Sequence, residues 1–258
     1  MAQNKRILFI AGEVAPFVEV SETAQLVRTL PEQLQNHGDF EARITMPRYG
    51  TIDERRNRLH EVIRLSGTDV AMGDTTETLT VKVASIPDIR LQVYFMDHSD
   101  YFGRDAIATD DDGGTFNDNA HRALFFNRSV LETISKLRWA PDVVHAFGWA
   151  GSLAPLLMHT EYAGDNVLGN AKVVYTPDAV DTDTLLTPAF ADSMDLAVDN
   201  LGDGQSLSAV GTAHADAVIY PPSLSANGSG AHQFAAEEEA RLEQLTALYD
   251  EMLSEVPA

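Results

Sequence analysis

The stretch RILFIAGEVAPFVEVSETAQLVRTLP, residues 6–31, decides the fold of this chain. An apolar run at its start predicts a buried strand that ends at Gly12. After a loop, apolar residues recur at helical spacing at Leu26, Val27, Leu30 and Leu34. A strand, a loop and a helix N-terminus in this order form a common cradle for phosphate groups. Glu19, Ser21 and Glu22 fill the loop, however, and their chemistry opposes an anion there.

The composition is that of a globular protein. The chain has 258 residues, of which 44% are apolar, so it can bury the core of one large domain or two small ones. It has no cysteine, which excludes disulfides, thiolate nucleophiles and cysteine metal sites. No apolar run approaches the roughly 20 residues that span a bilayer, and residues 1–12 lack the layout of a signal peptide. We therefore expect a cytoplasmic protein without a membrane partner.

The charge is strongly negative. Asp and Glu number 39 against 18 Lys and Arg, which gives a net charge of −21. Such a surface repels nucleic acid and anionic lipid, because affinity for phosphate backbones comes from clustered Lys and Arg. A surface rich in Asp and poor in Lys is also what a high-salt cytoplasm favours, since salt screens the self-repulsion. A high-salt habitat is thus a hypothesis from composition.

Strand and helix patterns alternate along most of the chain. The pattern predicts strands at residues 6–12, 41–46, 142–146, 172–176 and 217–220. It predicts helices at residues 24–37, 119–137, 152–160 and 206–215. Strand–helix units of this kind form a mostly parallel sheet with helices on both faces. The fold class is therefore α/β, a Rossmann-like three-layer domain.

Two segments depart from this alternation. Residues 59–65, 78–86 and 90–96 are rich in β-formers without an intervening helix, and we expect them to form a β-hairpin excursion. Residues 221–230 read as a linker, and residues 234–256 as an amphipathic helix that covers the sheet or binds a partner. We accordingly divide the chain into a domain at 1–223 and a linker and packing helix at 224–258.

Six segments of the chain carry recognisable motifs. They are ILFIAGEVAPFV (7–18), MPRYGTIDERR (46–56), VYFMDHSDYFGR (93–104), DNAHRALFFNRSVLE (118–132), WAPDVVHAFGWAGSLAPLL (139–157) and HADAVIYPPS (214–223). Together, and in this order, they resemble the N-terminal half of bacterial glycogen and starch synthases. The resemblance implies one half of a GT-B glycosyltransferase fold. The family transfers glucose from ADP- or UDP-glucose to a 1,4-α-glucan.

The chain departs from the family pattern where that pattern carries its chemistry. The family's first loop reads Lys-Thr-Gly-Gly-Leu-Ala-Asp after APFV, and its Lys neutralises the sugar-nucleotide phosphates. The altered positions here include Glu19, Ser21, Glu22 and Gln25. At about 4 Å and an effective dielectric near 20, one unit-charge pair is worth on the order of 4 kcal/mol, so Glu19 in place of the Lys is costly. The family's His-x-His-Asp-Trp also becomes His-Ala-Phe-Gly-Trp, with Phe147 and Gly148 at the changed positions.

Other family positions are kept. The resemblance places five residues in the candidate substrate-binding cleft: Glu13, Asp118, Asn119, His145 and Trp149. His145 ends a strand, so it either contacts a ligand or is a satisfied strand-end histidine. Trp149 either stacks on a sugar or packs in the core. No catalytic residue is assigned.

Several functions stay open at this point. The first is an α-glucan transferase, completed by a separate donor-domain chain, since the family's C-terminal domain is expected to be missing here. The second is a degenerate relative that binds glucan, acts as a scaffold or regulates without transfer. A third is an interaction module that binds no sugar. The expected partners are an α-glucan, a nucleotide-sugar or the separate donor chain, with no nucleic acid and no cofactor.

Three acidic motifs are weaker indications of a metal-binding or donor site. Residues 110–112 (DDD) suit a divalent cation or, in so acidic a chain, a solvated loop. Asp181-x-Asp183 resembles the metal motif of another glycosyltransferase class, which the resembled family does not need. Glu243 and Glu251 have the Glu-x7-Glu spacing of family donor domains, and we read the match as chance in an acidic helix. We predict no metal site.

Overall fold

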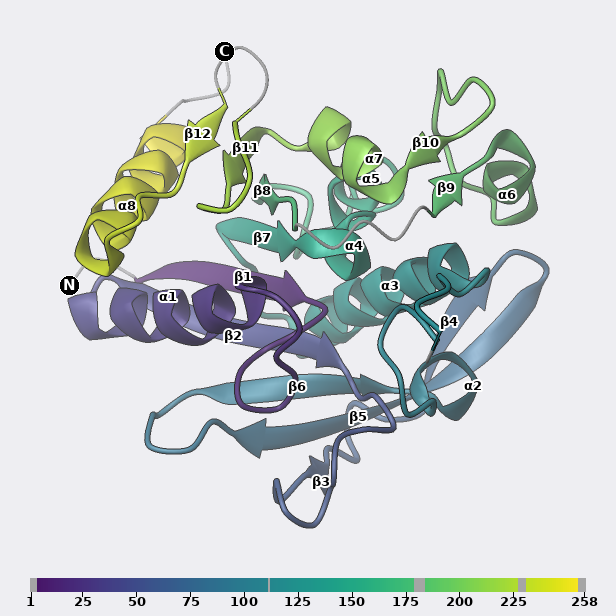
Figure 1. The fold of residues 1–258 in the computed structure, drawn as a ribbon, viewed down its shortest axis with the longest axis horizontal. Helices are drawn as coiled ribbons and strands as arrows, with labels where there is room; N and C mark the ends of the chain where they lie inside the picture. Colours follow the sequence, from purple (N-terminus) through teal and green to yellow (C-terminus); the bar gives the residue numbers. More distant parts are fainter. Residues whose placement is uncertain (1–3, 111, 179–183, 227–230, 255–258) are drawn as a thin grey trace.

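A twisted ten-stranded sheet forms the centre of the molecule (Figure 1). This computed structural model describes residues 4–110, 112–178, 184–226 and 231–254. The strand order is β12-β11-β8-β7-β1-β2-β6-β5-β3, and β4 pairs with β5 beside this path. From β12 to β6 every neighbouring pair is parallel. The mostly parallel Rossmann-like sheet expected from the sequence is therefore present.

The parallel part follows the predicted strands closely. Its strands are β1 (Lys5–Ala11), β2 (Phe40–Pro47), β6 (Gln92–Asp97), β7 (Val143–Phe147), β8 (Lys172–Thr176), β11 (Ala217–Tyr220) and β12 (His232–Gln233). In β1, Ile7 to Ala11 are fully buried, because helices cover both faces of the sheet. The two-residue β12 was not expected, since it lies beside the predicted linker.

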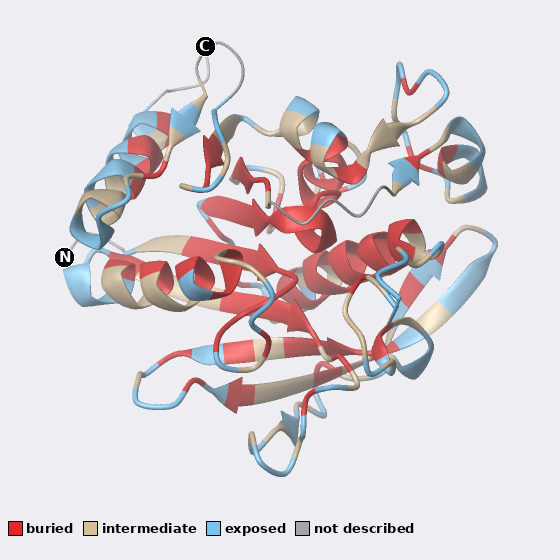
Figure 2. Ribbon diagram, viewed as in Figure 1, coloured by how far each residue is buried: buried red, intermediate tan, exposed pale blue. Residues whose placement is uncertain are grey.

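Helices cover both faces and make the three layers. They are α1 (Thr23–His37), α2 (Ser99–Phe102), α3 (Asn119–Leu137), α4 (Gly148–Gly151), α5 (Ala154–His159), α6 (Pro188–Ser193), α7 (Leu207–His214) and α8 (Glu238–Ser254). Helices α1 and α8 lie side by side on one face, at the left of Figure 1. Helices α3, α4, α5 and α7 contact one another and the sheet on the other face. Figure 2 shows that burial is concentrated where these layers meet.

The β excursion forms: the strands expected over 78–86 and 90–96 are present as β5 and β6, while the rest of the excursion differs from expectation. It consists of β3 (His60–Glu61), β4 (Thr68–Met72) and β5 (Thr75–Ser85), with β5 antiparallel to β3, β4 and β6. The strand expected over 59–65 is wrong beyond Glu61, because the backbone turns there: the Ser66 N–H donates to the Val62 carbonyl at 3.0 Å. The strand β4 was missed.

A short strand pair and the C-terminal helix are two further features of the chain after β8. Strands β9 (Leu185–Leu186) and β10 (Gln205–Ser206) form a separate antiparallel pair. Helix α8 ends the described chain and buries Leu245, Leu248, Tyr249 and Met252. The helix expected over 234–256 begins four residues later than predicted. Its last residues, like Asp111, Asp181 and Asp183 of the acidic motifs, lie outside the described residues.

Candidate functional site

A pocket of about 260 Å³ lies at the carboxyl ends of β1 and β7. The sheet order reverses here, since β1 is flanked by β2 on one side and β7 on the other. Ligands of open α/β sheets bind at this kind of position. Glu13, Thr23, Trp149 and Asp178 supply polar groups to the pocket walls. The segment 106–109 closes the opposite side.

Gly12 allows the first loop to pass close to α4. A Cβ at this position would lie 2.8 Å from the Cβ of Ala150 and 3.6 Å from the hydroxyl of Tyr49. Any side chain would push these elements apart. The strand end is therefore packed directly against α4, and Glu13 is the first residue of the loop that can reach into the pocket.

The carboxylate of Glu13 folds the loop back onto itself. Its Oε2 accepts hydrogen bonds from the backbone N–H groups of Val20 at 2.6 Å and Ser21 at 2.9 Å. Its Oε1 accepts from the Ser21 hydroxyl. Glu13 is only 6% exposed, so these charge-assisted bonds form largely out of water. An internal anion thus occupies loop donors that lie beside the pocket.

The first N–H groups of α1 are also occupied. The Thr23 N–H donates to the Ser21 hydroxyl at 3.1 Å, and the Ala24 N–H donates to the Ser21 carbonyl at 3.3 Å. The Gln25 N–H donates to the Glu22 carbonyl at 3.1 Å. A helix binds phosphate through such N–H groups when they are free. Here the chain itself satisfies them.

The remaining altered residues of the loop have partners within the chain as well. The amide of Gln25 donates to the Glu19 carboxylate at 2.9 Å. The Glu22 carboxylate accepts from the Ser223 N–H at 3.1 Å, which ties the start of α1 to the segment after β11. The side chains at the altered positions Glu19, Ser21, Glu22 and Gln25 are therefore all hydrogen-bonded within the chain.

Gly148 and Asp178 replace the arrangement that the resembled family has after β7. Gly148 has φ +63, a left-handed conformation that favours glycine. A Cβ there would lie 2.1 Å from Oδ2 of Asp178, and the same oxygen accepts from the Trp149 N–H at 3.2 Å. A carboxylate from the end of β8 therefore fills the space that a side chain at 148 would need. Phe147, fully buried, forms an apolar wall of the pocket.

His145 does not line this pocket. It is fully buried, and its Nδ1 lies 2.7 Å from the Tyr249 hydroxyl while its Nε2 lies 2.8 Å from the Thr176 hydroxyl. Its ring stacks on Phe147 at a centroid distance of 4.1 Å. Burial lowers the pKa of the imidazole to about 3, so it is neutral. The structure thus places His145 behind the pocket wall, under α8.

Asp118 and Asn119 lie at the start of α3 and act on the pocket through the 106–109 segment. Asn119 is fully buried, and its amide donates to the Ala108 carbonyl at 2.9 Å. The Asp118 carboxylate accepts from Arg104, with 2.8 Å between Oδ1 and Nη1. Burial opposes ionisation of Asp118, but the bonds and charge of Arg104 outweigh it and lower the pKa. Neither residue is among the pocket-lining side chains.

Arg122 is a residue of this region that sequence reasoning missed. Its guanidinium is fully buried and donates to the Asn119 side-chain oxygen and to the Tyr101 carbonyl, both at 2.7 Å. It lies 5.5 Å from the Trp149 ring centre. Its Nη2 and the buried Tyr49 hydroxyl have no hydrogen-bond partner within the described residues. The signal was its position one helical turn after Asn119, on the same face.

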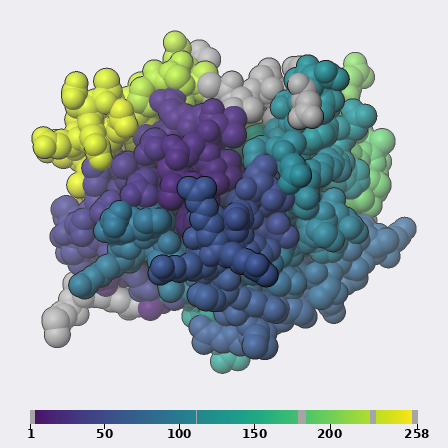
Figure 3. Space-filling view, turned by 60° about the horizontal axis from the view of Figure 1, so that its bottom comes forward, coloured from purple at the N-terminus to yellow at the C-terminus, as the bar shows by residue number. Residues whose placement is uncertain are grey.

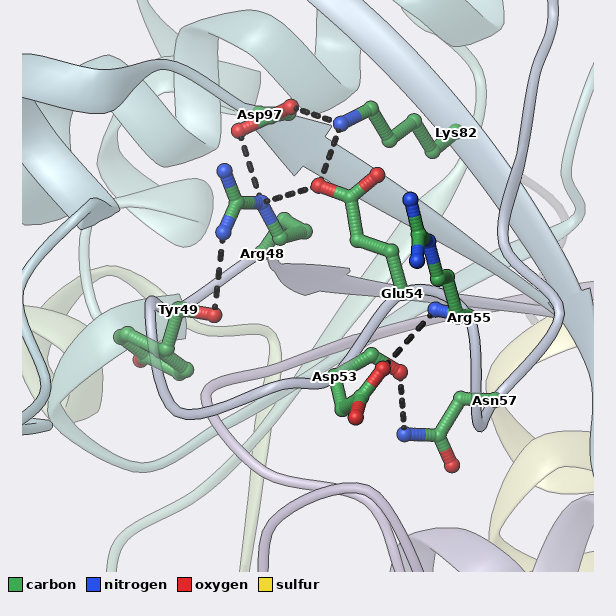
Figure 4. A network of polar contacts seen from close by, with 8 residues as sticks. All are labelled: Arg48, Tyr49, Asp53, Glu54, Arg55, Asn57, Lys82 and Asp97. Atoms are coloured by element: carbon green, nitrogen blue, oxygen red, sulfur yellow. Dashed lines mark hydrogen bonds and ion pairs between the residues drawn. The ribbon is translucent and has the colours of Figure 1, made fainter.

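A network of charged side chains fixes the end of β2 (Figure 4). Asp97 binds Arg48 at 3.0 Å and Lys82 at 2.7 Å, and Lys82 also binds Glu54 at 2.6 Å. Burial alone lowers the pKa of Lys82, but its bonds to Asp97 and Glu54 outweigh burial and raise it. The network holds Arg48 and so positions Tyr49, the next residue, beside Gly12.

The acidic loop after α2 is a self-bonded turn. Oδ1 of Asp110 accepts from the N–H groups of Asp112 at 3.1 Å and Gly114 at 2.7 Å. Within the described ranges, no group of three or more metal-ligating side chains is arranged to hold a metal ion. No helix of that part of the chain is long and apolar enough to cross a membrane.

The described chain is thus an α/β domain of Rossmann type with a pocket at the sheet's switch point. A family model described as the starch synthase catalytic domain matches residues 6–219. The chain belongs to this family.

Curated relatives and a solved structure are similar over most of the chain. Glycogen synthase from Chlorobium limicola is 36% identical over 250 residues, which cover 93% of this chain and 51% of that protein. Glycogen synthase from Chlorobium phaeobacteroides is 42% identical over 177 residues, 67% of this chain and 36% of that protein. The catalytic domain of starch synthase IV from Arabidopsis thaliana, bound to ADP and acarbose, has a TM-score of 0.70 at 19% identity, over 96% of this chain and 50% of that one. The chain thus spans about half the length of the Chlorobium limicola protein, and the matched part covers 36% of the Chlorobium phaeobacteroides protein.

Proposed function

We propose that this chain binds α-glucan as a non-catalytic member of the glycogen and starch synthase family. In this proposal the pocket at the end of β1 and β7 takes a glucosyl unit. The loop before α1 no longer takes the phosphates of a sugar nucleotide. The protein then acts in α-glucan metabolism as a binding, scaffolding or regulatory component.

The observation that carries the proposal is the capture of the loop donors by Glu13. A phosphate-binding loop must offer free N–H groups or a cation to the anion. Here the N–H groups of Val20 and Ser21 bind the Glu13 carboxylate, and the first N–H groups of α1 bind Ser21 and Glu22. A phosphate would have to displace these bonds and approach several carboxylates. We infer that nucleotide binding at this loop is lost.

The pocket chemistry favours a sugar. Trp149 and Phe147 form apolar walls, against which the C–H face of a pyranose ring can pack. Glu13 and Asp178 bring carboxylate oxygens to the same space, and carboxylates accept hydrogen bonds from sugar hydroxyls. The volume of about 260 Å³ accommodates one sugar ring rather than a whole nucleotide.

The neighbour from Arabidopsis supports the same class of ligand. That starch synthase is bound to ADP and acarbose, a nucleotide and a saccharide. The changes at Glu19, Ser21, Glu22 and Gln25 fall on the loop that the resemblance assigns to the nucleotide, and those at Phe147 and Gly148 fall on a second segment. In our proposal the chain retains recognition of the saccharide through the kept residues Glu13 and Trp149.

A second candidate is glucosyl transfer in which a separate donor-domain chain supplies the nucleotide grip. Family membership favours it, because the curated relatives are glycogen synthases. In that case cationic side chains of the partner have to neutralise the negative charges of Glu19 and Glu22. Transfer activity then appears only when the two chains are mixed.

Calorimetry and a transfer assay on one sample test the first candidate. Maltotetraose, ADP-glucose and UDP-glucose are titrated into the protein, and glucose transfer to maltotetraose is measured in parallel. We expect heat from maltotetraose, none from the sugar nucleotides, and no transfer. Glucose transfer by the chain alone contradicts the proposal. If the protein binds neither maltotetraose nor a sugar nucleotide, both candidates are wrong.

A further inference from the structure

A second hollow lies away from the pocket, against the β excursion. Its volume is about 700 Å³. One wall is the turn that carries Arg56 and Arg58, and the other is the turn between β5 and β6 that carries Arg90. Figure 3 views this face, where the dark-blue residues around 50–60 lie across the centre and the blue turn around 85–90 lies to their left.

The charges around this arginine groove contrast with those of the rest of the chain. Residues 40–92 contain eight Arg and Lys and eight Asp and Glu, so they are neutral. The other 205 residues carry the whole net charge of −21. Lining the groove are Arg56, Arg58 and Arg90 against a single carboxylate, that of Asp88. The groove is therefore a positive site on a very negative protein.

The three arginines have no acidic partner in the described chain. Ion pairs form elsewhere in the excursion, but none includes Arg56, Arg58 or Arg90. All three are exposed. Three guanidinium groups without an acidic partner in the described chain thus surround one hollow. It leaves their forked donors open to a ligand.

The acidic residues of the same turn, Asp53 and Glu54, are bonded to groups of their own chain, as Figure 4 shows. The Asp53 carboxylate accepts from the backbone N–H groups of Arg55 at 2.9 Å and Arg56 at 3.0 Å. Glu54 binds Lys82 at 2.6 Å inside the ion network. Both acids thus hold the turn in place rather than neutralising its arginines. The cations are presented on a fixed backbone.

The floor of the groove is apolar. Phe17, Ile86 and Ile89 line it. The Phe17 ring packs edge-on against Phe95 at a centroid distance of 5.1 Å, which fixes its position. Cations around an apolar floor suit a ligand with an anionic group and a ring or chain behind it.

We propose that the arginine groove binds a small phosphate ester. Guanidinium forks match phosphate oxygens in pairs, and a phosphomonoester carries about −1.5 to −2 charges at neutral pH. The volume fits a metabolite-sized ligand. The site is separate from the pocket at β1 and β7, so it goes beyond the proposed function, and either can fail without the other.

Calorimetry with phenyl phosphate tests the site. The probe has one phosphomonoester and one ring, and inorganic phosphate, benzoate and phenol are its partial analogues. We expect phenyl phosphate to bind at least tenfold more tightly than each analogue at 50 mM salt. Equal affinity for benzoate overturns the preference for phosphate, and equal affinity for inorganic phosphate overturns the role of the apolar floor. No heat from phenyl phosphate overturns the proposal.

Two double variants separate local contacts from overall charge. Arg56→Ala with Arg90→Ala removes two groove arginines, and Arg55→Ala with Arg64→Ala removes two exposed arginines of the same excursion that do not line the groove. We expect the first to lose affinity for phenyl phosphate at least tenfold and the second less than threefold, with unchanged thermal midpoints. Equal losses of affinity in the two double variants overturn the site. Self-association of the protein that phenyl phosphate does not reverse also overturns it, because the groove is then occupied by the acidic surface of a second copy.

Discussion

The imidazole Nδ1 of His145 lies 2.7 Å from the hydroxyl of Tyr249, so the end of β7 is bonded to the C-terminal helix α8. Both groups are fully buried. The bond joins two segments 104 residues apart. Helix α8 is therefore held on the sheet by a buried hydrogen bond, which fixes its position, as well as by apolar contacts.

Tyr249→Phe removes this bond and little else. The His145 nitrogen then lacks a partner in a buried site, which destabilises the protein by about 1–3 kcal/mol. Thermal and urea unfolding measure the change. Tyr94→Phe is the matched control, since the Tyr94 ring is half-buried and its hydroxyl makes no hydrogen bond within the described residues. Equal effects of the two substitutions contradict the assignment.

Acid should destabilise the protein through His145. The folded-state pKa is about 3 against about 6.5 in the unfolded chain, so the unfolded state binds the proton first. The contribution is fully present above pH 6.5 and is lost progressively as the pH falls toward 3. It amounts to several kcal/mol at the acid end, on the order of 1.4 per pKa unit.

The free energy of unfolding, measured against pH for wild type and His145→Asn, isolates this term. Carboxylates contribute equally to both proteins, so the difference between the two curves reports the imidazole. A difference that stays constant from pH 7 to pH 4 refutes the prediction.

Glu13→Gln should loosen the loop before α1. The amide keeps one acceptor oxygen but loses the charge that strengthens the bonds from Val20 and Ser21, a loss of about 1.5–3 kcal/mol. Hydrogen exchange at these two amides should accelerate, which NMR spectra recorded after transfer into D2O detect. Glu19→Gln changes the same charge at an exposed bond to Gln25, and there we expect under about 0.5 kcal/mol.

Gly148→Ala should destabilise the protein through both φ and crowding. The left-handed backbone is unfavourable for alanine by about 1–2 kcal/mol, and the new Cβ collides with Asp178. In an Asp178→Ala background the collision is absent and the backbone term remains. A double-mutant cycle by urea unfolding should therefore give a coupling of at least about 1 kcal/mol, and additive effects count against the contact.

Trp149→Leu should weaken binding of maltotetraose about tenfold, a change of about 1.4 kcal/mol. Leucine keeps the wall apolar but removes the flat ring that faces a sugar. Trp139→Leu is the control, because Trp139 is equally buried and donates to Glu41 at 2.8 Å, away from the pocket. If both variants bind like the wild type, the sugar lies elsewhere.

The parallel sheet could be predicted from the sequence because its strands are short apolar runs separated by helical periodicity. Strand β4 could not be predicted from the sequence. Its five residues, TDVAM, include an aspartate, and the alternation of apolar and polar residues is too short to indicate a strand. The turn at Ser66 likewise depends on a single backbone bond to Val62. Such local choices are decided by tertiary contacts rather than by pattern.

The candidate site was predictable in its residue types but not in their partners. The sequence places Glu13 and Trp149 at strand ends, and the structure brings both to one pocket. His145 also ends a strand, but which face of β7 it occupies depends on α8, which is far away in the sequence. That Glu13 would satisfy the altered loop was equally invisible, because it required the path of the backbone around Pro16.

The neutral segment 40–92 has a consequence for the whole molecule. Because this segment includes the strands at the β3 end of the sheet and the remaining residues carry −21, charge is distributed unevenly over the molecule, which gives it an electric dipole. On an anion-exchange matrix it will adsorb through the opposite, acidic faces. The arginine groove then faces the mobile phase, so our proposal predicts that the adsorbed protein still binds a small phosphate ester.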